Sequence, residues 1–387
     1  MDQQLRRRQR ALFVFFFLPG VALASWVTRT PEIRDAIGAS VAQMGLVLFG
    51  MSMGSMAGIL GSGRIVSRFG TRFASLLGLW LVFVSLLAIA LGVIWGSQLV
   101  AAVGLGFFGL GMGVAEIGIN LDASQVERLV GRPVLHTLHG CFSLGTLCGA
   151  LVGLSLISLG VTVRTHMLVM AVLVAVMILI FRGGMVAGFG IGSARRVDMA
   201  GGRPVWRDPR VLLIGMIVFA MALAEGSAND WLPIVMVDEH GFSQASGSLI
   251  FVGFAAAMTV GRFGGGFFLH RFGATNVMRV CAALGAAGIG YIALGSTPWM
   301  AGVAVVMWGI GASLGFPVAL SAAGRGGEGA VARVKAVAIV GYVAMLVGPP
   351  GLGMVGESYG LRVALLIVTA LVAGAFCIAP AVGPERD

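Results

Sequence analysis

Two stretches of the sequence decide the fold: residues 35–70, DAIGASVAQMGLVLFGMSMGSMAGILGSGRIVSRFG, and residues 238–273, DEHGFSQASGSLIFVGFAAAMTVGRFGGGFFLHRFG. They align without a gap and share an Asp-x-x-Gly-x-Ser opening, several glycines and an Arg-Phe-Gly close. Each copy consists of a polar loop, an apolar helix and a basic turn. The repeat therefore predicts two similar halves that cross the membrane in the same orientation, an architecture found among secondary transporters.

The amino-acid composition indicates which environment surrounds the protein. Of its 387 residues, 58% are hydrophobic and only 11% carry a charge. A soluble domain has about 25% charged residues. So few charges cannot cover a water-exposed surface of this size, and most of the surface is expected to face lipid.

Apolar stretches of about 20 residues, each long enough to cross a bilayer, give the spans. They predict an all-α membrane protein of twelve transmembrane helices, at 11–29, 43–63, 74–95, 98–120, 134–159, 165–182, 211–236, 245–268, 275–295, 299–322, 335–357 and 361–380. The predicted division is an N-terminal six-helix bundle over 1–182, a cytoplasmic linker over 183–209 and a C-terminal six-helix bundle over 210–387.

The net charge of +10 is explained by membrane topology. If the N-terminus is inside, most Arg residues fall in cytoplasmic segments, and the opposite side keeps Arg29, Arg34, Arg164 and Arg362. This positive-inside bias places both termini in the cytoplasm, with anionic lipids as contacts and no nucleic acid as partner. The preference for Arg over Lys is typical of a GC-rich bacterial genome, so we expect a bacterial inner membrane. No motif indicates a metal or a cofactor.

Ionisable side chains inside predicted spans are the first candidates for function, because they are costly in lipid. Glu116 and Asn120 lie one turn apart in the helix at 98–120, and Glu225 and Asn229 lie one turn apart in the helix at 211–236. Burial among glycine-rich helices disfavours a charged carboxylate, which suits a proton carrier. Both glutamates are therefore predicted to couple transport to protons. The alternative for Glu116 is a structural hydrogen bond to another helix.

Further polar residues in the spans are predicted to bind the solute. His139 titrates near neutral pH and is placed where it can reach Glu116 across neighbouring helices. Asp230 and Trp231 either grip a polar ligand such as a sugar or anchor their helix at the membrane interface, where Trp is enriched. The predicted solute-binding residues are Asn120, His139, Asn229, Asp230 and Trp231.

The basic turn of the first repeat resembles a known transporter loop. Residues 63–72 read Gly-x-x-x-Ser-Arg-x-Gly-x-Arg, similar to the loop between helices two and three of the major facilitator superfamily, although Ser67 stands where that family usually has Asp. The resemblance implies a cytoplasmic gate made of Gly63, Arg68, Gly70, Arg72 and, in the second repeat, Arg271. We expect Arg68 and Arg72 to lie beside Asp122 or Glu127.

Other motifs resemble one branch of that superfamily, the L-fucose permease-like transporters. They are Glu116-x-x-x-Asn120, Leu138-His139-Gly140, Glu225-Gly226 with Asp230-Trp231, and Gly348-Pro349-Pro350. Val27 stands where fucose permease has an Asp. The resemblance implies proton symport of a small, sugar-like solute by alternating access, in a monomer.

Two other functions remain as alternatives. A proton-driven exporter of drugs or metabolites usually has a Gly-x-x-x-Gly-Pro motif in helix five, and this chain has Gly145 and Gly149 without the proline. An intramembrane enzyme needs a nucleophile with a placed base, or a zinc motif, and neither is visible. The sequence therefore favours a symporter and no enzymatic activity.

Overall fold

The computed structural model describes residues 3–131, 134–192, 207–325 and 329–383, and these form an all-helical chain. The helices are α1 (Gln3–Val27), α2 (Thr30–Ala36), α3 (Val41–Trp95), α4 (Gln98–Val130), α5 (Leu135–Ser158), α6 (Val163–Phe181), α7 (Pro209–Asp238), α8 (Gln244–Leu294), α9 (Pro298–Ala323), α10 (Ala330–Tyr359), α11 (Leu361–Ile378) and the short η3 (Ala379–Val382). The predicted span boundaries agree with these helices to within a few residues, except that α1 begins eight residues earlier, α10 begins five residues earlier and α4 extends ten residues further.

Ten helices in the described part of the chain are long and apolar enough to cross a membrane. Two of them, α3 with 55 residues and α8 with 51, are much longer than the roughly 20 residues that one crossing needs. Each contains one glycine with non-helical torsion angles, Gly70 (φ 86°) in α3 and Gly273 (φ 75°) in α8. Only glycine adopts such angles without strain, so both long helices bend at the end of the repeated stretch.

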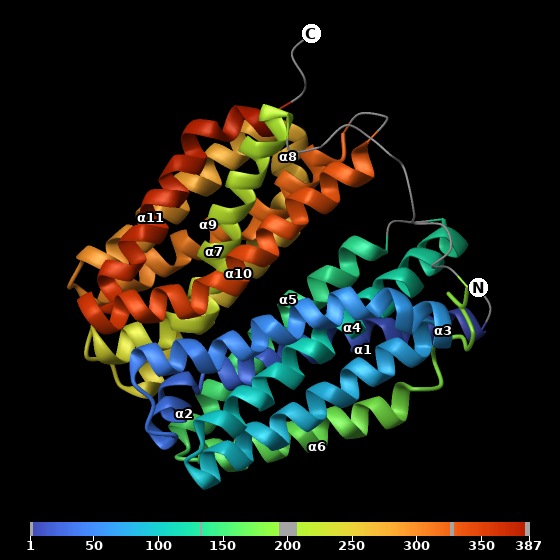
Figure 1. The fold of residues 1–387 in the computed structure, drawn as a ribbon, viewed down its shortest axis with the longest axis horizontal. Coiled ribbons are helices and arrows are strands. Elements are labelled where there is room, and N and C mark those ends of the chain that lie inside the picture. The colour runs from blue at the N-terminus through green and yellow to red at the C-terminus, as the bar shows by residue number, and fades with distance from the viewer. Residues whose placement is uncertain (1–2, 132–133, 193–206, 326–328, 384–387) are drawn as a thin grey trace. The chain divides into compact units, whose positions relative to one another are not determined.

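The chain forms two compact units, Met1–Asp198 and Met199–Asp387 (Figure 1). In the first unit, α4 packs against both parts of α3, and α1 packs against α5. In the second unit, α9 packs against α8, and α7 packs against α10. The two units thus repeat one packing scheme. The predicted linker falls mostly on residues 193–206, which lie outside the described part.

Identities shared by the two repeated stretches have the same structural role in both units. Ser40 and Ser243 cap the N-termini of α3 and α8 with their hydroxyl groups. Gly70 and Gly273 make the two bends. The caps satisfy backbone N–H groups that a helix start leaves unpaired. Local backbone requirements therefore preserve these residues in both copies.

Glycines let helices of the first unit approach until their backbones touch. Gly50 and Gly58 of α3 lie against Ala102 and Leu110 of α4, and Gly109 of α4 lies against Met51 of α3. Between α1 and α5 the same role falls to Gly20, Gly145 and Gly149. In lipid, where no hydrophobic effect drives helices together, small residues at such contacts provide the packing.

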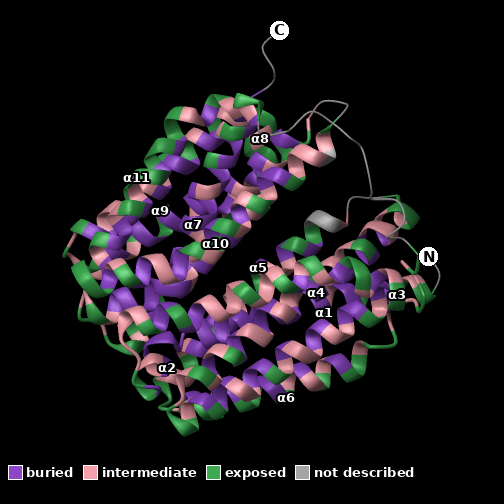
Figure 2. Ribbon diagram, in the orientation of Figure 1, coloured by how far each residue is buried: buried purple, intermediate pink, exposed green. Residues whose placement is uncertain are grey.

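The outer surface of the helices is apolar along its length. Leu60 of α3 and Leu99 of α4 are each 73% exposed, and Val172 and Ile180 of α6 are 61% and 63% exposed. Figure 2 shows exposed positions recurring along α6 and α11. An exposed apolar surface of this extent is incompatible with water and fits a bilayer.

A carboxylate caps the last long helix of each unit. In the first unit, Glu32 accepts a hydrogen bond from the Val163 N–H at the start of α6 (3.0 Å) and pairs with the buried Arg29 (2.5 Å). In the second, Glu239 accepts from the Leu361 N–H at the start of α11 (3.0 Å). Each cap ties the end of α1 or α7 to the helix that closes its unit.

His240 completes the cap of the second unit. It lies in the turn after α7, with Nε2 2.9 Å from the Ile292 carbonyl oxygen and Nδ1 3.4 Å from the Arg362 guanidinium. Burial lowers the pKa of His240; the Ile292 carbonyl raises it, Arg362 lowers it and Glu239 raises it. The net direction is downward, so the folded protein favours the neutral ring.

We expect Gly109→Ala to lower the thermal unfolding midpoint in detergent, because the added methyl group overlaps the Met51 carbonyl oxygen and forces α3 and α4 apart. Gly61→Ala is the matched control, since a Cβ at Gly61 meets nothing within 4 Å. That control should be neutral or slightly stabilising, because alanine favours helix by about 1 kcal/mol over glycine. Equal midpoints for the two variants would contradict the packing role.

The lowered pKa of His240 gives its cap a pH dependence. Stability from the neutral ring is fully present above the unfolded-state pKa of about 6.5 and is lost as the pH falls below it, because the unfolded chain binds the proton more readily. Between pH 7.5 and 5.5 the unfolding midpoint of the wild type should fall more than that of His240→Gln. Parallel curves for the two proteins would exclude His240 as the titrating group.

Candidate functional site

Glu116 lies on an exposed face of α4 within the first unit. Its carboxyl group makes no hydrogen bond to a described residue. Asn120, one turn further along, is partly exposed on the same face. The glycine contacts of α4 lie on its other faces: Gly109 and Gly113 face the first part of α3, and Gly111 and Gly118 face the second. The role predicted for Glu116 stays a prediction.

His139 is exposed on α5, and its ring packs edge-on against Phe16 of α1, with ring centroids 5.1 Å apart. It makes a further interaction, but not a hydrogen bond to Glu116. The expected contact between His139 and Glu116 is therefore not formed. Glu116, Asn120 and His139 remain polar groups on the surface of the first unit.

Glu225 of α7 forms an ion pair with Arg262 of α8 in the second unit. The Arg262 Nη2 atom donates a hydrogen bond to Glu225 Oε1 at 2.8 Å. The two side chains are 24% and 17% exposed for arginine and glutamate respectively, so the pair is largely desolvated yet reachable. Both residues belong to helices that qualify as membrane spans.

The depth of this pair follows from helix geometry. Glu225 lies about 20 Å before the end of α7 and Arg262 about 27 Å after the start of α8, at 1.5 Å per residue. The two helices meet at the turn 239–243, so these distances are measured from the same end. The Arg262 side chain tilts back toward the start of α8, which closes the remaining gap to Glu225.

The three residues Asn229, Asp230 and Trp231, which follow Glu225 on α7, differ in how far they are buried. Asn229, one turn on, is partly exposed, and its amide has no partner among the described residues. Asp230 is 8% exposed and Trp231 is 1% exposed. Both roles predicted for Trp231, as an interface anchor and as a solute contact, stay predictions. Its indole N–H has no partner among the described residues.

Sequence reasoning missed Arg262 as a functional residue because it was counted among the cytoplasmic charges. The signal was present: Arg262 lies inside the predicted helix at 245–268, not beyond its end. An arginine at that depth needs a carboxylate partner. Of the two carboxylates in the predicted helix at 211–236, Glu225 is the one whose depth is closer to that of Arg262.

A second ion pair, between Arg8 and Asp122, is fully buried at the end of the first unit where α1 begins. Arg8 Nε and Nη2 donate to the two Asp122 carboxylate oxygens at 2.9 and 2.6 Å. Arg8 also donates to Gln125 Oε1, and Thr71 Oγ1 donates to Asp122 Oδ1 at 3.4 Å. We call Arg8, Thr71, Asp122 and Gln125 the Arg8 cluster.

The segment after α6 covers the Arg8 cluster. The Thr71 N–H donates to the Phe189 carbonyl oxygen at 2.7 Å, and the Gly192 N–H donates to the Ser67 carbonyl oxygen at 2.9 Å. The Phe189 ring lies 5.5 Å from the Arg8 guanidinium carbon. The start of the predicted linker is thus docked on the bend at Gly70 instead of being free.

The expected gate pairs are not formed in this structure. Asp122 pairs with Arg8, and Glu127 accepts a hydrogen bond from the Val134 N–H at 2.8 Å. Arg68 is exposed and stacks on Phe69, 5.2 Å from its ring. The other predicted gate residues have no common partner: Arg72 is partly exposed, Arg271 is exposed, and a Cβ at Gly63 meets nothing.

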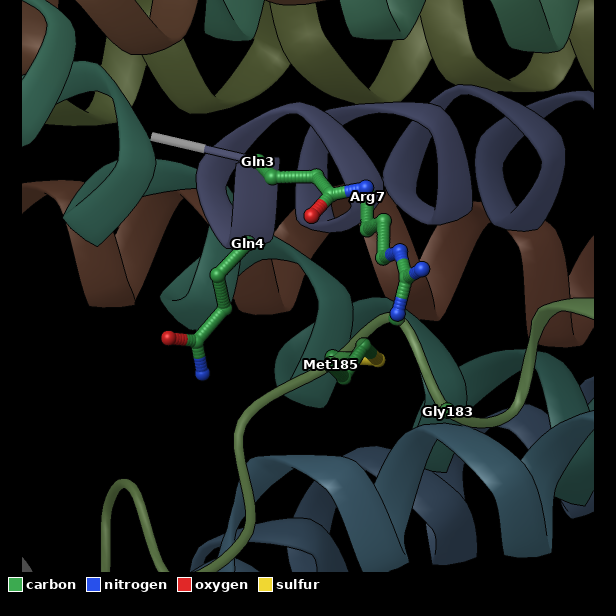
Figure 3. Close-up of a pocket in the computed structure, with 6 residues that line it drawn as sticks. Gln3, Gln4, Arg7, Gly183 and Met185 are labelled. Atoms are coloured by element: carbon green, nitrogen blue, oxygen red, sulfur yellow. The ribbon is translucent and has the colours of Figure 1, made fainter. Parts of the chain in front are cut away.

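One further pocket of about 370 Å³ lies at the start of α1. Figure 3 shows Gln3, Gln4 and Arg7 of α1 beside the segment that holds Gly183 and Met185. None of its lining residues belongs to the predicted site, and its only charge is that of Arg7. Among the described residues, no three His, Cys, Asp or Glu side chains are grouped to hold a metal ion.

Comparisons with known proteins agree on one class of protein, the transporters of the Major Facilitator Superfamily. Residues 11–338 match the family model described as Major Facilitator Superfamily. An uncharacterized MFS-type transporter of Yersinia pestis is 30% identical over 363 residues, covering 92% of this chain and 91% of that protein. An uncharacterized transporter of Sinorhizobium fredii is 28% identical over 378 residues, covering 96% and 97%. A crystal structure of a mutant nucleoside transporter NupG has a TM-score of 0.78 at 14% identity, covering 97% and 99%, and shows a common fold.

Arg8→Gln should lower the free energy of unfolding by about 3–5 kcal/mol, because it leaves the Asp122 carboxylate buried without a cation. The double variant Arg8→Gln/Asp122→Asn should recover part of this loss, since it removes both charges. Arg68→Gln is the control and should cost about 1 kcal/mol or less, because its stacking on Phe69 is exposed. The measurement is denaturant unfolding in detergent. Equal effects of Arg8→Gln and Arg68→Gln would contradict the assignment.

Proposed function

The chain belongs to the Major Facilitator Superfamily and is a multi-pass membrane transporter, and from this premise we propose that it is a proton-coupled symporter of a small polar solute. In this proposal α3 and α8 each cross the membrane twice, at either side of Gly70 and Gly273, which gives twelve spans. The two units alternate access to the solute from a bacterial inner membrane, with both termini in the cytoplasm. The charge distribution of the sequence supports that orientation.

The observation that carries the proposal is the pair of Glu225 and Arg262 at span depth. An empty symporter must return across the membrane without a proton, and a loaded one must cross with it. The Glu225–Arg262 pair has no net charge when Glu225 is ionised, so the empty carrier can return unprotonated. A proton on Glu225 breaks the pair and is tolerated only if another negative group joins Arg262.

Glu116 does not meet this requirement, since no described cation lies beside it. An ionised Glu116 remains a single charge at span depth, and the empty carrier cannot return cheaply in that form. We therefore place the coupled proton on Glu225. Glu116, Asn120 and His139 on the first unit, and Asn229 on the second, are proposed to hold hydroxyl groups of the solute. Their mixture of donors and acceptors suits a sugar-like ligand and supports the L-fucose permease-like branch.

Proteoliposomes test the direction and the coupling. Uptake of labelled polyols, sugars and organic acids is measured with the outside acid, with no gradient, and with a protonophore. Accumulation that needs the acid outside and vanishes with the protonophore supports symport. Accumulation that needs the acid inside would indicate the exporter, and uptake indifferent to the gradient would contradict proton coupling.

We expect Glu225→Gln to retain counterflow exchange of labelled solute but to lose accumulation driven by a pH gradient, because glutamine cannot release a proton. Glu116→Gln is the comparison, and it should keep gradient-driven accumulation while its KM changes. Glu357→Gln, exposed near the end of α10, is the matched neutral control. Loss of accumulation in Glu116→Gln with retention in Glu225→Gln would return the proton to Glu116.

A further inference from the structure

We propose that Arg262 binds a carboxylate group of the transported solute and that Glu225 is the counter-ion which the solute displaces. This inference rests on the symport function proposed above and names its substrate class: a small hydroxylated organic anion, such as a sugar acid. It starts from an ion pair of the second unit that lies within the spans and is partly exposed.

The contact between the two side chains is weaker than a guanidinium–carboxylate pair can be. Arg262 holds Glu225 through one hydrogen bond, from Nη2 to Oε1. A guanidinium presents five N–H donors in a planar fork that matches a carboxylate with two parallel hydrogen bonds. A solute that binds in this way forms a better contact with Arg262 than Glu225 forms in the structure.

Stability does not account for the pair. Replacing a buried ion pair with apolar side chains of similar size is often neutral or stabilising. The fully buried Arg8–Asp122 pair is bidentate and supported by two further side chains, as a structural pair requires. The Glu225–Arg262 pair is more exposed, with an unpartnered amide, Asn229, one turn away. Both features fit a site that opens to a ligand.

Charge balance links the anion to the proton. In the empty carrier, Arg262 and ionised Glu225 cancel. When a carboxylate takes Arg262, ionised Glu225 loses its cation, and a proton from water restores neutrality. Anion and proton together give a neutral site, whereas either alone leaves one net charge at span depth, which is costly. The pair therefore couples one solute carboxylate to one proton.

Few other groups compete for that proton. Asp230 is the nearest ionisable group on α7, and α9 has none. The remaining ionisable side chains of α7 and the helices packed against it are Arg210, Asp238, His270, Arg271, Arg279, Cys281, Tyr291, Arg333, Lys335, Tyr342, Glu357, Tyr359, Arg362 and Cys377. Among the described residues, Arg262 is the cation whose guanidinium contacts Glu225, at 2.8 Å.

Binding to the purified full-length protein tests the substrate class without transport. The probes are matched pairs that differ by a carboxylate: gluconate with sorbitol, glycerate with glycerol, and lactate with 1,2-propanediol. Isothermal titration in two buffers of different ionisation enthalpy gives Kd and proton uptake. We expect at least one carboxylate to bind more tightly than its alcohol, with uptake of about one proton, and to bind more tightly as the pH falls from 7.5 to 6.

Substitutions at Glu225 and Arg262 separate the contribution that each residue makes to carboxylate binding. Glu225→Gln should tighten carboxylate binding about tenfold or more at neutral pH and abolish proton uptake, because the internal competitor is gone. In that background, Arg262→Gln should weaken binding at least about 30-fold, and Arg262→Lys should restore only part of it. This background avoids leaving Glu225 unpaired, so a failure to fold does not obscure the result.

Three results would overturn the proposal: equal binding of carboxylates and alcohols, unchanged binding when Arg262→Gln is added to Glu225→Gln, or no binding of any carboxylate probe. The proposed symport can fail separately. Arg262-dependent binding without accumulation driven by a pH gradient would keep the anion site and remove symport. Gradient-driven accumulation of a neutral polyol, with binding indifferent to Arg262, would keep symport and remove the anion site.

Discussion

Close backbone contact between helices is the constraint on which the rest of this structure depends. In lipid each helix satisfies its own backbone hydrogen bonds, so only the fit between helix surfaces holds a unit together. Glycines at the helix contacts supply that fit, as at Gly109 against Met51 and Gly145 against Phe17. Polar side chains are then not needed to join most helices. Those that do lie at span depth are few, and each one requires a specific explanation.

Three ion pairs among the described residues differ in a way that separates structural from functional roles. Arg8 and Asp122 are 5% and 0% exposed and share a bidentate contact with added support from Gln125 and Thr71. Arg29 joins Glu32, His166 and the Val161 carbonyl oxygen at the end of α1. Both arrangements give the guanidinium several partners and tie helix ends together. Arg262 and Glu225 instead meet through one hydrogen bond, away from any helix end, where a ligand can compete for the arginine.

The helices could be predicted from the sequence because their signals are local. Span length, the capping serines Ser40 and Ser243, and the repeated Gly70 and Gly273 each act within a few residues. The partners of charged residues depend on which helix faces another, and the one-dimensional pattern does not contain this. The sequence alone therefore explains Arg8 and Arg262 by topology, although Arg8 is buried against Asp122 and Arg262 is partly buried against Glu225. The face of α4 that carries Glu116 could not be predicted for a related reason, because glycines lie on two other faces of that helix.

The contrast between Glu116 and Glu225 shows why a lone carboxyl at span depth is a weak guide to coupling. A carrier that transports a proton with its solute needs two states of low energy, one empty and unprotonated, the other loaded and protonated. A lone carboxyl supplies only the protonated state, because its ionised form lacks a counter-charge in lipid. An arginine beside the carboxyl supplies the empty state through the ion pair, and the solute's own charge supplies the loaded one. The arginine therefore makes the proton and the solute depend on each other, which the carboxyl by itself cannot do.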